Sequence, residues 1–115
     1  MTRGFKRTEE FDKEWANMGL DDEEQRKLEQ MLLDNPKAGA VIPGTGRLRK
    51  MRYAPGGKGK SGGIRILYVD FEAYGIVYLI TTYPKSEKDD ISQEERRIFK
   101  QYINRLQQAL GGRNR

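Results

Sequence analysis

Apolar residues recur every three or four positions in two stretches near the N-terminus, and this period predicts two helices. The first is capped by Thr8 and ends at Gly19, and the second runs from its cap Asp21 to the Asn35-Pro36 pair. The short connection predicts an antiparallel hairpin of helices, preceded by a short strand that includes Phe5. The apolar faces comprise Phe11, Trp15 and Met18 in the first helix, and Leu28, Met31 and Leu32 in the second.

The middle of the chain has the pattern of β-strands. Ile64–Phe71 and Gly75–Tyr83 carry β-branched and aromatic residues at both parities, which is typical of central strands covered on both faces. A four-residue turn joins them, so the pair is predicted to be antiparallel. Arg47–Tyr53 is predicted as a further strand that contains a bulge, because Leu48 and Met51 are out of phase.

A last helix is predicted from the capping box formed by Ser92 and Glu95, and Gly111-Gly112 ends it. Residues 1–112 are expected to form a single domain, with residues 113–115 as a frayed tail. The predicted fold class is α+β: a small antiparallel sheet with an N-terminal helical hairpin and a C-terminal helix, in the order (β)ααβββα. One side of the last helix is apolar and comprises Ile98, Phe99, Tyr102, Ile103, Leu106 and Leu110.

The chain has no cysteine and no histidine, which limits the chemistry available to it. Disulfides and thiolate catalysis are excluded, and the usual general base and commonest metal ligand are missing, so we expect no metal and no cofactor. Glu87, Asp89 and Asp90 are interpreted as an acidic turn before the last helix, not as a metal site. The longest apolar run, Ile76–Ile80, is too short to span a bilayer, and the N-terminus lacks a signal-peptide pattern, which predicts a cytoplasmic protein.

Positive charge is concentrated in the middle of the chain. Residues 37–68 contain eight Lys or Arg residues and no Asp or Glu, whereas residues 1–36 contain six basic and ten acidic side chains; the net charge is +5. A block of like charge destabilises a fold unless an anion relieves the repulsion, and polyphosphate backbones are the commonest anions that span several charges. We therefore expect the glycine-rich segment Arg47–Arg65 to be a functional site that binds a polyphosphate backbone; the alternative is a solvated loop between two strands.

One motif in this segment is misleading. Ala54–Ser61 satisfies a relaxed phosphate-binding-loop pattern, and Ile66–Asp70 resembles the strand that would hold magnesium. A phosphate-binding loop must open a helix, yet here a strand follows at once. The chain is also too short for the parallel core of such enzymes, so we do not expect a nucleoside triphosphatase.

Three segments, residues 42–54, 57–68 and 78–90, resemble the HigB-type branch of the RelE toxin superfamily. The resemblance extends from about Leu32 to Leu106 and is most specific in Gly57–Arg65. It implies a bacterial toxin that cuts messenger RNA, typically on the translating ribosome, and a cognate antitoxin with a helix-turn-helix DNA-binding domain. This chain lacks the histidine that some relatives have near the last strand, so the general acid stays open.

RNA cleavage by attack of the 2′-hydroxyl needs a base, cations on the phosphate and a proton donor for the leaving 5′-oxygen. Lys58 and Lys60 are candidates for the base, because neighbouring cations should lower an ammonium pKa. Arg65 is suited to a two-pronged grip on the scissile phosphate. Tyr83 or Lys85 is the candidate acid or phosphate clamp, and the alternative for both is ordinary strand-end structure.

Other residues of the basic segment are candidates for binding RNA without taking part in the reaction. Tyrosines of strands can stack on bases, although they more often pack in a core. A non-catalytic RNA- or ribosome-binding module is the alternative function, since it would use the same surface. The candidate RNA-binding residues are Arg47, Arg49, Lys50 and Arg52 for the phosphate backbone, and Tyr53 and Tyr68 for bases.

Overall fold

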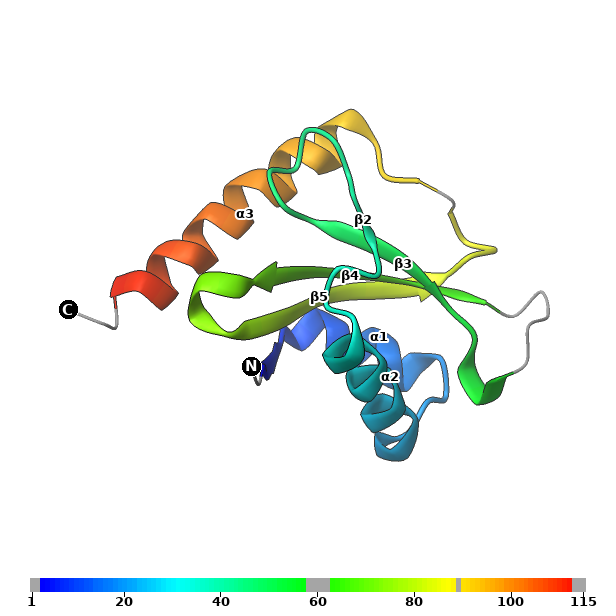
Figure 1. Cartoon of the computed structure of the whole chain (residues 1–115). Coiled ribbons are helices and arrows are strands. Elements are labelled where there is room, and N and C mark those ends of the chain that lie inside the picture. The colour runs from blue at the N-terminus through cyan, green and yellow to red at the C-terminus, as the bar shows by residue number, and fades with distance from the viewer. Residues whose placement is uncertain (1–2, 58–62, 89, 113–115) are drawn as a thin grey trace.

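A five-stranded mixed sheet lies between two layers of helices (Figure 1). The computed structural model describes residues 3–57, 63–88 and 90–112. The strand order is β1-β5-β4-β3-β2, and short 3-10 turns follow β3 and β4. The elements are β1 (Gly4–Arg7), α1 (Glu9–Asn17), α2 (Asp22–Asp34), β2 (Ala40–Val41), β3 (Arg49–Tyr53), β4 (Ile64–Phe71), β5 (Ile76–Pro84) and α3 (Gln93–Gly112).

The helical hairpin of α1 and α2 covers one face of the sheet, called here the hairpin face. The Thr8 side chain accepts a hydrogen bond from the Phe11 N–H at 2.9 Å, and the Asp21 side chain accepts one from the Glu24 N–H at 2.9 Å. Both predicted caps are therefore confirmed. The hairpin-face core comprises Phe11, Trp15, Leu28, Leu32, Met51, Tyr53, Ile64, Ile66, Tyr68, Val77 and Leu79.

The helix α3 covers part of the opposite face, called here the α3 face. Ser92 and Glu95 form the predicted capping box: each side chain accepts a hydrogen bond from the other's backbone N–H, at 2.8 and 3.1 Å. The two glycines predicted to end the helix are its last two residues. None of the helices in the described ranges is both long enough and apolar enough to cross a membrane. The buried α3-face core comprises Ile42, Leu48, Leu67, Val69, Phe71, Ile80, Tyr83, Ile91, Ile103 and Leu110.

The sheet confirms the α+β class but is mixed, not purely antiparallel. β3, β4 and β5 pair antiparallel as predicted, whereas β1 pairs parallel to β5, with Phe5 opposite Val77. The two-residue strand β2 was not predicted, because Ala40–Val41 is too short to show a strand period. The observed order is βααββββα.

The bulge predicted within Arg47–Tyr53 is wrong, and a bulge that was not predicted lies in β5. Leu79 and Thr81 pair with adjacent residues of β4, so Ile80 has no partner in the register. The β3–β4 register is continuous, because β3 begins at Arg49 and Leu48 precedes it. The phase difference that suggested a bulge therefore marks the start of the strand.

Candidate functional site

Three of the candidate side chains form a row across the sheet. Arg52 of β3 is directly opposite Arg65 of β4, and Arg65 is directly opposite Tyr83 of β5. Residues directly opposite one another have Cβ atoms about 5 Å apart. All three face α3, since the sequence neighbours of Arg52 and Arg65 belong to the hairpin-face core and Tyr83 belongs to the α3-face core. The row therefore brings two guanidinium groups and a phenol together.

The bulge in β5 brings Tyr83 to this face. Leu79 belongs to the hairpin-face core, and a regular two-residue period would direct Tyr83 to the same face. The extra residue Ile80 shifts the phase, so Tyr83 joins the α3-face core instead. Bulges occur next to active sites for this reason, because they redirect a side chain without changing the rest of the strand.

Two members of the row, Arg65 and Tyr83, are buried. Arg65 is 8% exposed and Tyr83 is 6% exposed. The hydroxyl of Thr82 donates to the carbonyl of Arg65 at 2.8 Å, which fixes the strands at this point. Such burial limits the rotamer freedom of both side chains.

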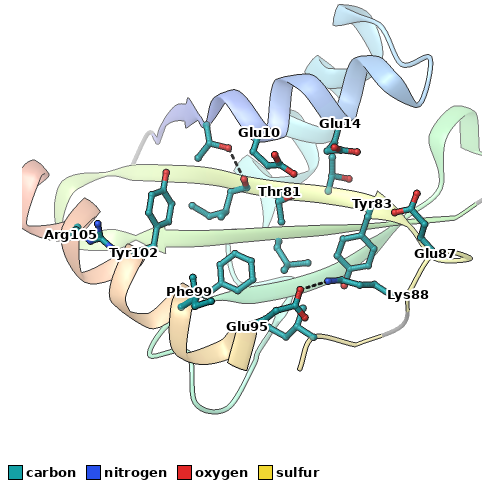
Figure 2. A pocket seen from close by; sticks show the side chains of 16 residues that line it. Glu10, Glu14, Thr81, Tyr83, Glu87, Lys88, Glu95, Phe99, Tyr102 and Arg105 are labelled. Carbon is teal, nitrogen blue, oxygen red and sulfur yellow. Dashed lines mark hydrogen bonds and ion pairs between the residues drawn. The ribbon is translucent and has the colours of Figure 1, made fainter. Parts of the chain in front are cut away.

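Lys88 adds a cation that the sequence did not suggest. Its ammonium lies 5.4 Å from the centre of the Tyr83 ring and donates a hydrogen bond to Glu95 (Figure 2). That hydrogen bond lowers the pKa of the Glu95 carboxyl. A single lysine inside an acidic run carries no recognisable pattern, so only the fold reveals it.

The other predicted catalytic residues are divided between described and undescribed parts of the chain. Lys85 is exposed in the turn after β5, and its N–H donates to the Gly63 carbonyl at 3.0 Å. This contact holds Lys85 at the end of the sheet where β4 begins, the end that carries Arg65. Lys58 and Lys60 lie outside the described residues.

Lys50 shares the α3 face with Arg52 because the two are separated by one residue of β3. The Lys50 ammonium lies 3.6 Å from a carboxylate oxygen of Asp90, which also pairs with Arg96 at 3.3 Å. The Ile91 N–H, and then these two cations, lower the pKa of Asp90. The predicted acidic turn thus connects β3 to α3 through Asp90.

Arg47 and Arg49 do not join the row. The Arg49 guanidinium is on the hairpin face and donates to the Gly39 carbonyl at 2.6 Å. The Arg47 guanidinium donates to Gln107 of α3 at 2.9 Å and lies 5.3 Å from the centre of the Phe71 ring. Because Phe71 is the last residue of β4, Arg47 lies at the opposite end of the sheet from Arg65.

The structure corrects the base-stacking role predicted for Tyr53 and Tyr68. Both rings belong to the hairpin-face core, and Tyr68 is fully buried. The Tyr53 hydroxyl donates to Glu24, and the Tyr68 hydroxyl donates to the Pro36 carbonyl at 2.9 Å. Burial raises the pKa of both phenols. Neither ring face is accessible to a base, so both tyrosines pack in the core, which was the alternative to base stacking.

In the described parts of the chain, no group of three or more acidic side chains could hold a metal ion. Asp70, the residue of the misleading magnesium motif, accepts hydrogen bonds from Arg3 at 2.8 Å and from Lys37 at 3.3 Å. It lies near the end of β4, five residues from Arg65. At about 3.3 Å per strand residue the two are about 17 Å apart.

The chain is similar to known toxins in sequence and in fold. Residues 3–112 match the sequence model of the family described as the RelE toxin of the RelE/RelB toxin–antitoxin system. The fold is similar to the free-state structure of an E. coli RelE toxin with two arginines changed to alanine, with a TM-score of 0.55 and 19% sequence identity. That match covers 77% of this chain and 90% of the other.

Proposed function

The chain belongs to the RelE toxin family, and we propose on this basis that it inhibits translation by cleaving messenger RNA on the ribosome, in the cytoplasm. Its family makes it the toxin of a toxin–antitoxin system. The observation that carries the RNA-cleaving role is the row of Arg52, Arg65 and Tyr83. Two of these three residues belong to the acid-free basic segment, residues 37–68. The HigB-type branch stays a prediction.

We propose that the 2′-oxygen of one nucleotide attacks the adjacent phosphorus atom. A 2′,3′-cyclic phosphate forms, and the bond from phosphorus to the 5′-oxygen of the next nucleotide breaks. Negative charge grows on the phosphate oxygens during the attack, and a fixed guanidinium stabilises it. Arg65 supplies that group from a rigid strand, while Arg52, which is exposed, holds the neighbouring phosphate.

The proton balance assigns two further roles. Lys58 or Lys60 takes the proton from the 2′-hydroxyl, and Tyr83 or Lys85 gives one to the leaving 5′-oxygen. The position of Tyr83 directly opposite Arg65 supports its role as the donor. Because lysine and arginine side chains supply the positive charge, we propose that the reaction needs no metal ion.

The decisive experiment compares two site variants with a control that removes a positive charge outside the site. We expect Arg65→Ala, and the pair Lys58→Ala with Lys60→Ala, to slow ribosome-dependent cleavage by about 10²–10³ without loss of fold. Arg26→Ala is the control, because Arg26 is exposed on α2 and has no side-chain partner in the described structure. Cleavage is measured by mapping message ends inside ribosome-protected codons, and folding by circular dichroism.

Two results would contradict this assignment in different ways. If the folded Arg65→Ala variant cleaves at the wild-type rate, the site is elsewhere. If the wild-type chain binds ribosomes and arrests translation without cutting the message, the protein is the non-catalytic binding module.

The family implies an antitoxin partner, and we propose that a neighbouring gene encodes one with a helix-turn-helix DNA-binding domain. Co-expression should rescue growth, and the two chains should copurify. A wild-type chain that is harmless alone and copurifies with no neighbouring product would contradict the toxin assignment.

A further inference from the structure

A groove of about 490 Å³ runs along the outer edge of β5, between α1 and α3 (Figure 2). Its floor is formed by Ile80–Tyr83, and its walls carry carboxylates from α1 and apolar side chains from α3. We call it the edge groove. Glu10 and Glu14 lie on the α1 wall, and Ile98, Phe99 and Tyr102 lie on the α3 wall.

The groove contacts β5 along its edge and not along one face. Residues of α1, on one face of the sheet, and of α3, on the other, both line it together with Ile80–Tyr83. β1 pairs only with Ile76–Leu79, and the Thr8 hydroxyl donates to the Ile80 carbonyl at 2.6 Å. No strand in the described ranges pairs beside Thr81–Pro84 on that side. The uncovered edge is therefore about 13 Å long at 3.3 Å per residue, and such an edge can pair with an added strand.

One apolar side chain of the α3 wall, Ile98, does not pack in the core. Ile98 is 54% exposed, although most apolar residues of α3 pack against the sheet. Phe99 and Tyr102 are partly buried and lie beside it in the groove. Exposed apolar side chains gathered around a groove mark a binding surface more often than scattered ones do.

The charge of the groove is opposite to that of the basic segment. Glu10, Glu14 and Glu87 line it, and within the described residues none of these three carboxylates has an ion-pair or hydrogen-bond partner. The fourth carboxylate, Glu95, is paired with Lys88, and Arg105 also lines the groove, so the lining carries four carboxylates and two cations. Unpaired carboxylates repel a phosphate backbone, so the groove favours a basic polypeptide over RNA.

We propose that the edge groove binds an extended segment of a protein partner, which adds as a strand beside Thr81–Tyr83. Alternate side chains of an added strand point to opposite faces of the sheet. One set would contact the acidic α1 wall and the other the apolar α3 wall, because α1 and α3 lie on opposite faces (Figure 1). The segment therefore alternates Lys or Arg with apolar residues. Under the proposed function, on which this last clause rests, the partner is the antitoxin.

The test uses a displayed library of random decapeptides selected on the purified full chain. We expect the selected peptides to alternate basic and apolar residues. Their affinity should fall at least tenfold for the double variant Glu10→Arg/Glu14→Arg and for Ile98→Glu. The control is Glu9→Arg/Glu23→Arg, which changes the net charge by the same amount at exposed residues outside the groove and should bind like wild type.

Several results would overturn the proposal. These are absence of enrichment, enrichment of acidic peptides, and equal binding to the groove variants. The groove variants change no residue of the proposed RNA site, so they should cleave RNA like wild type. Failure of the proposed function appears separately, as a wild-type chain that binds peptides but neither cleaves RNA nor arrests growth.

Whether the antitoxin is the partner that binds in the groove can be tested by growth of cells that make both proteins. Toxicity of the groove variants should persist beside an antitoxin that neutralises the wild-type chain. If that antitoxin neutralises the variants equally well, it does not bind in the edge groove, and the partner of the groove is another protein.

Discussion

Replacing Asp70 with asparagine removes a buried charge while keeping the shape of the side chain. The Asp70 carboxylate accepts hydrogen bonds from the Arg3 Nε at 2.8 Å and Nη2 at 3.3 Å, and from Lys37 at 3.3 Å. The Asp70 side chain is 3% exposed and the Arg3 side chain 10% exposed. The variant therefore leaves a nearly buried guanidinium without its main counter-charge.

The expected loss of stability follows from these exposures. Removing one partner of a buried ion pair costs about 3–5 kcal/mol. Lys37 is more than half exposed, so its pairing with Asp70 contributes little. Glu72 pairs with Lys37 at 2.9 Å and also attracts Arg3, which offsets part of the loss. We therefore expect Asp70→Asn to lower the free energy of unfolding by about 2–3 kcal/mol at pH 7.

The difference should depend on pH in a defined direction. Burial alone raises the pKa of Asp70, but the hydrogen bond from Arg3 and the pairing with Lys37 outweigh it, so the pKa is lowered in the folded protein. A lowered folded-state pKa gives stability above the unfolded-state pKa of about 3.9, and this stability is lost as pH falls through the folded-state value. The gap between wild type and Asp70→Asn should therefore be full at pH 7 and close below about pH 3.9.

Urea unfolding followed by the fluorescence of Trp15, the single tryptophan, measures this gap. The control is Glu23→Gln, an exposed carboxylate on α2 that should change little. An Asp70→Asn variant as stable as wild type at pH 7, or a gap that persists in acid, would refute the ion-pair reasoning. RNA cleavage per folded molecule should be unchanged in this variant. If Asp70 held a magnesium ion needed for the reaction, the substitution would abolish cleavage.

Two further predictions concern backbone packing and metal ions. Gly39→Ala would place a Cβ atom 2.9 Å from the Lys50 carbonyl oxygen and 3.0 Å from a Tyr68 ring carbon. We therefore expect the free energy of unfolding, measured by heat or urea, to fall by about 1–3 kcal/mol. An unchanged unfolding midpoint would show that β3 can shift to accept the methyl group. Cleavage should survive EDTA once ribosome integrity is controlled, because basic side chains supply the positive charge; activity that is lost to EDTA and restored by a divalent ion at constant ribosome concentration would contradict this.

The helices could be predicted because their signals are local. Thr8, Asp21 and Ser92 each accept a hydrogen bond from an N–H three residues later, so cap and helix are read from the same few positions. The strands predicted over Ile64–Phe71 and Gly75–Tyr83, observed as β4 and β5, were equally clear, since a short turn fixes their pairing. In each case the stabilising contacts lie within one turn or one hairpin.

Pairing between distant segments left no comparable signal. β1 pairs with a strand about seventy residues later, and nothing in its four residues specifies a parallel partner. The bulge at Ile80 is hidden because Ile76–Ile80 is apolar at both parities, so a phase shift does not change the pattern. Since that shift decides which face Tyr83 occupies, the sequence could nominate Tyr83 but not place it beside Arg65.

Charge composition located the basic segment but could not divide it between the two faces. Alternation along β3 separates Arg49 from Lys50 and Arg52, and Arg47 lies before the strand and packs on α3. A count of lysines and arginines has no direction, whereas a strand directs successive side chains to opposite faces. The predicted RNA-binding set therefore included more residues than the α3 face presents beside Arg65.

Tyr83 belongs both to the row with Arg65 and to the floor of the edge groove, so the two surfaces meet at one side chain (Figure 2). Lys88, whose ammonium lies over the Tyr83 ring, lines the same groove. A strand bound along β5 would contact both residues without covering Arg52, which is two strands away. Such a partner would therefore inhibit the protein by contacting Tyr83, the proposed proton donor, and not by neutralising the basic segment. For this reason the bound segment of the partner can itself be basic.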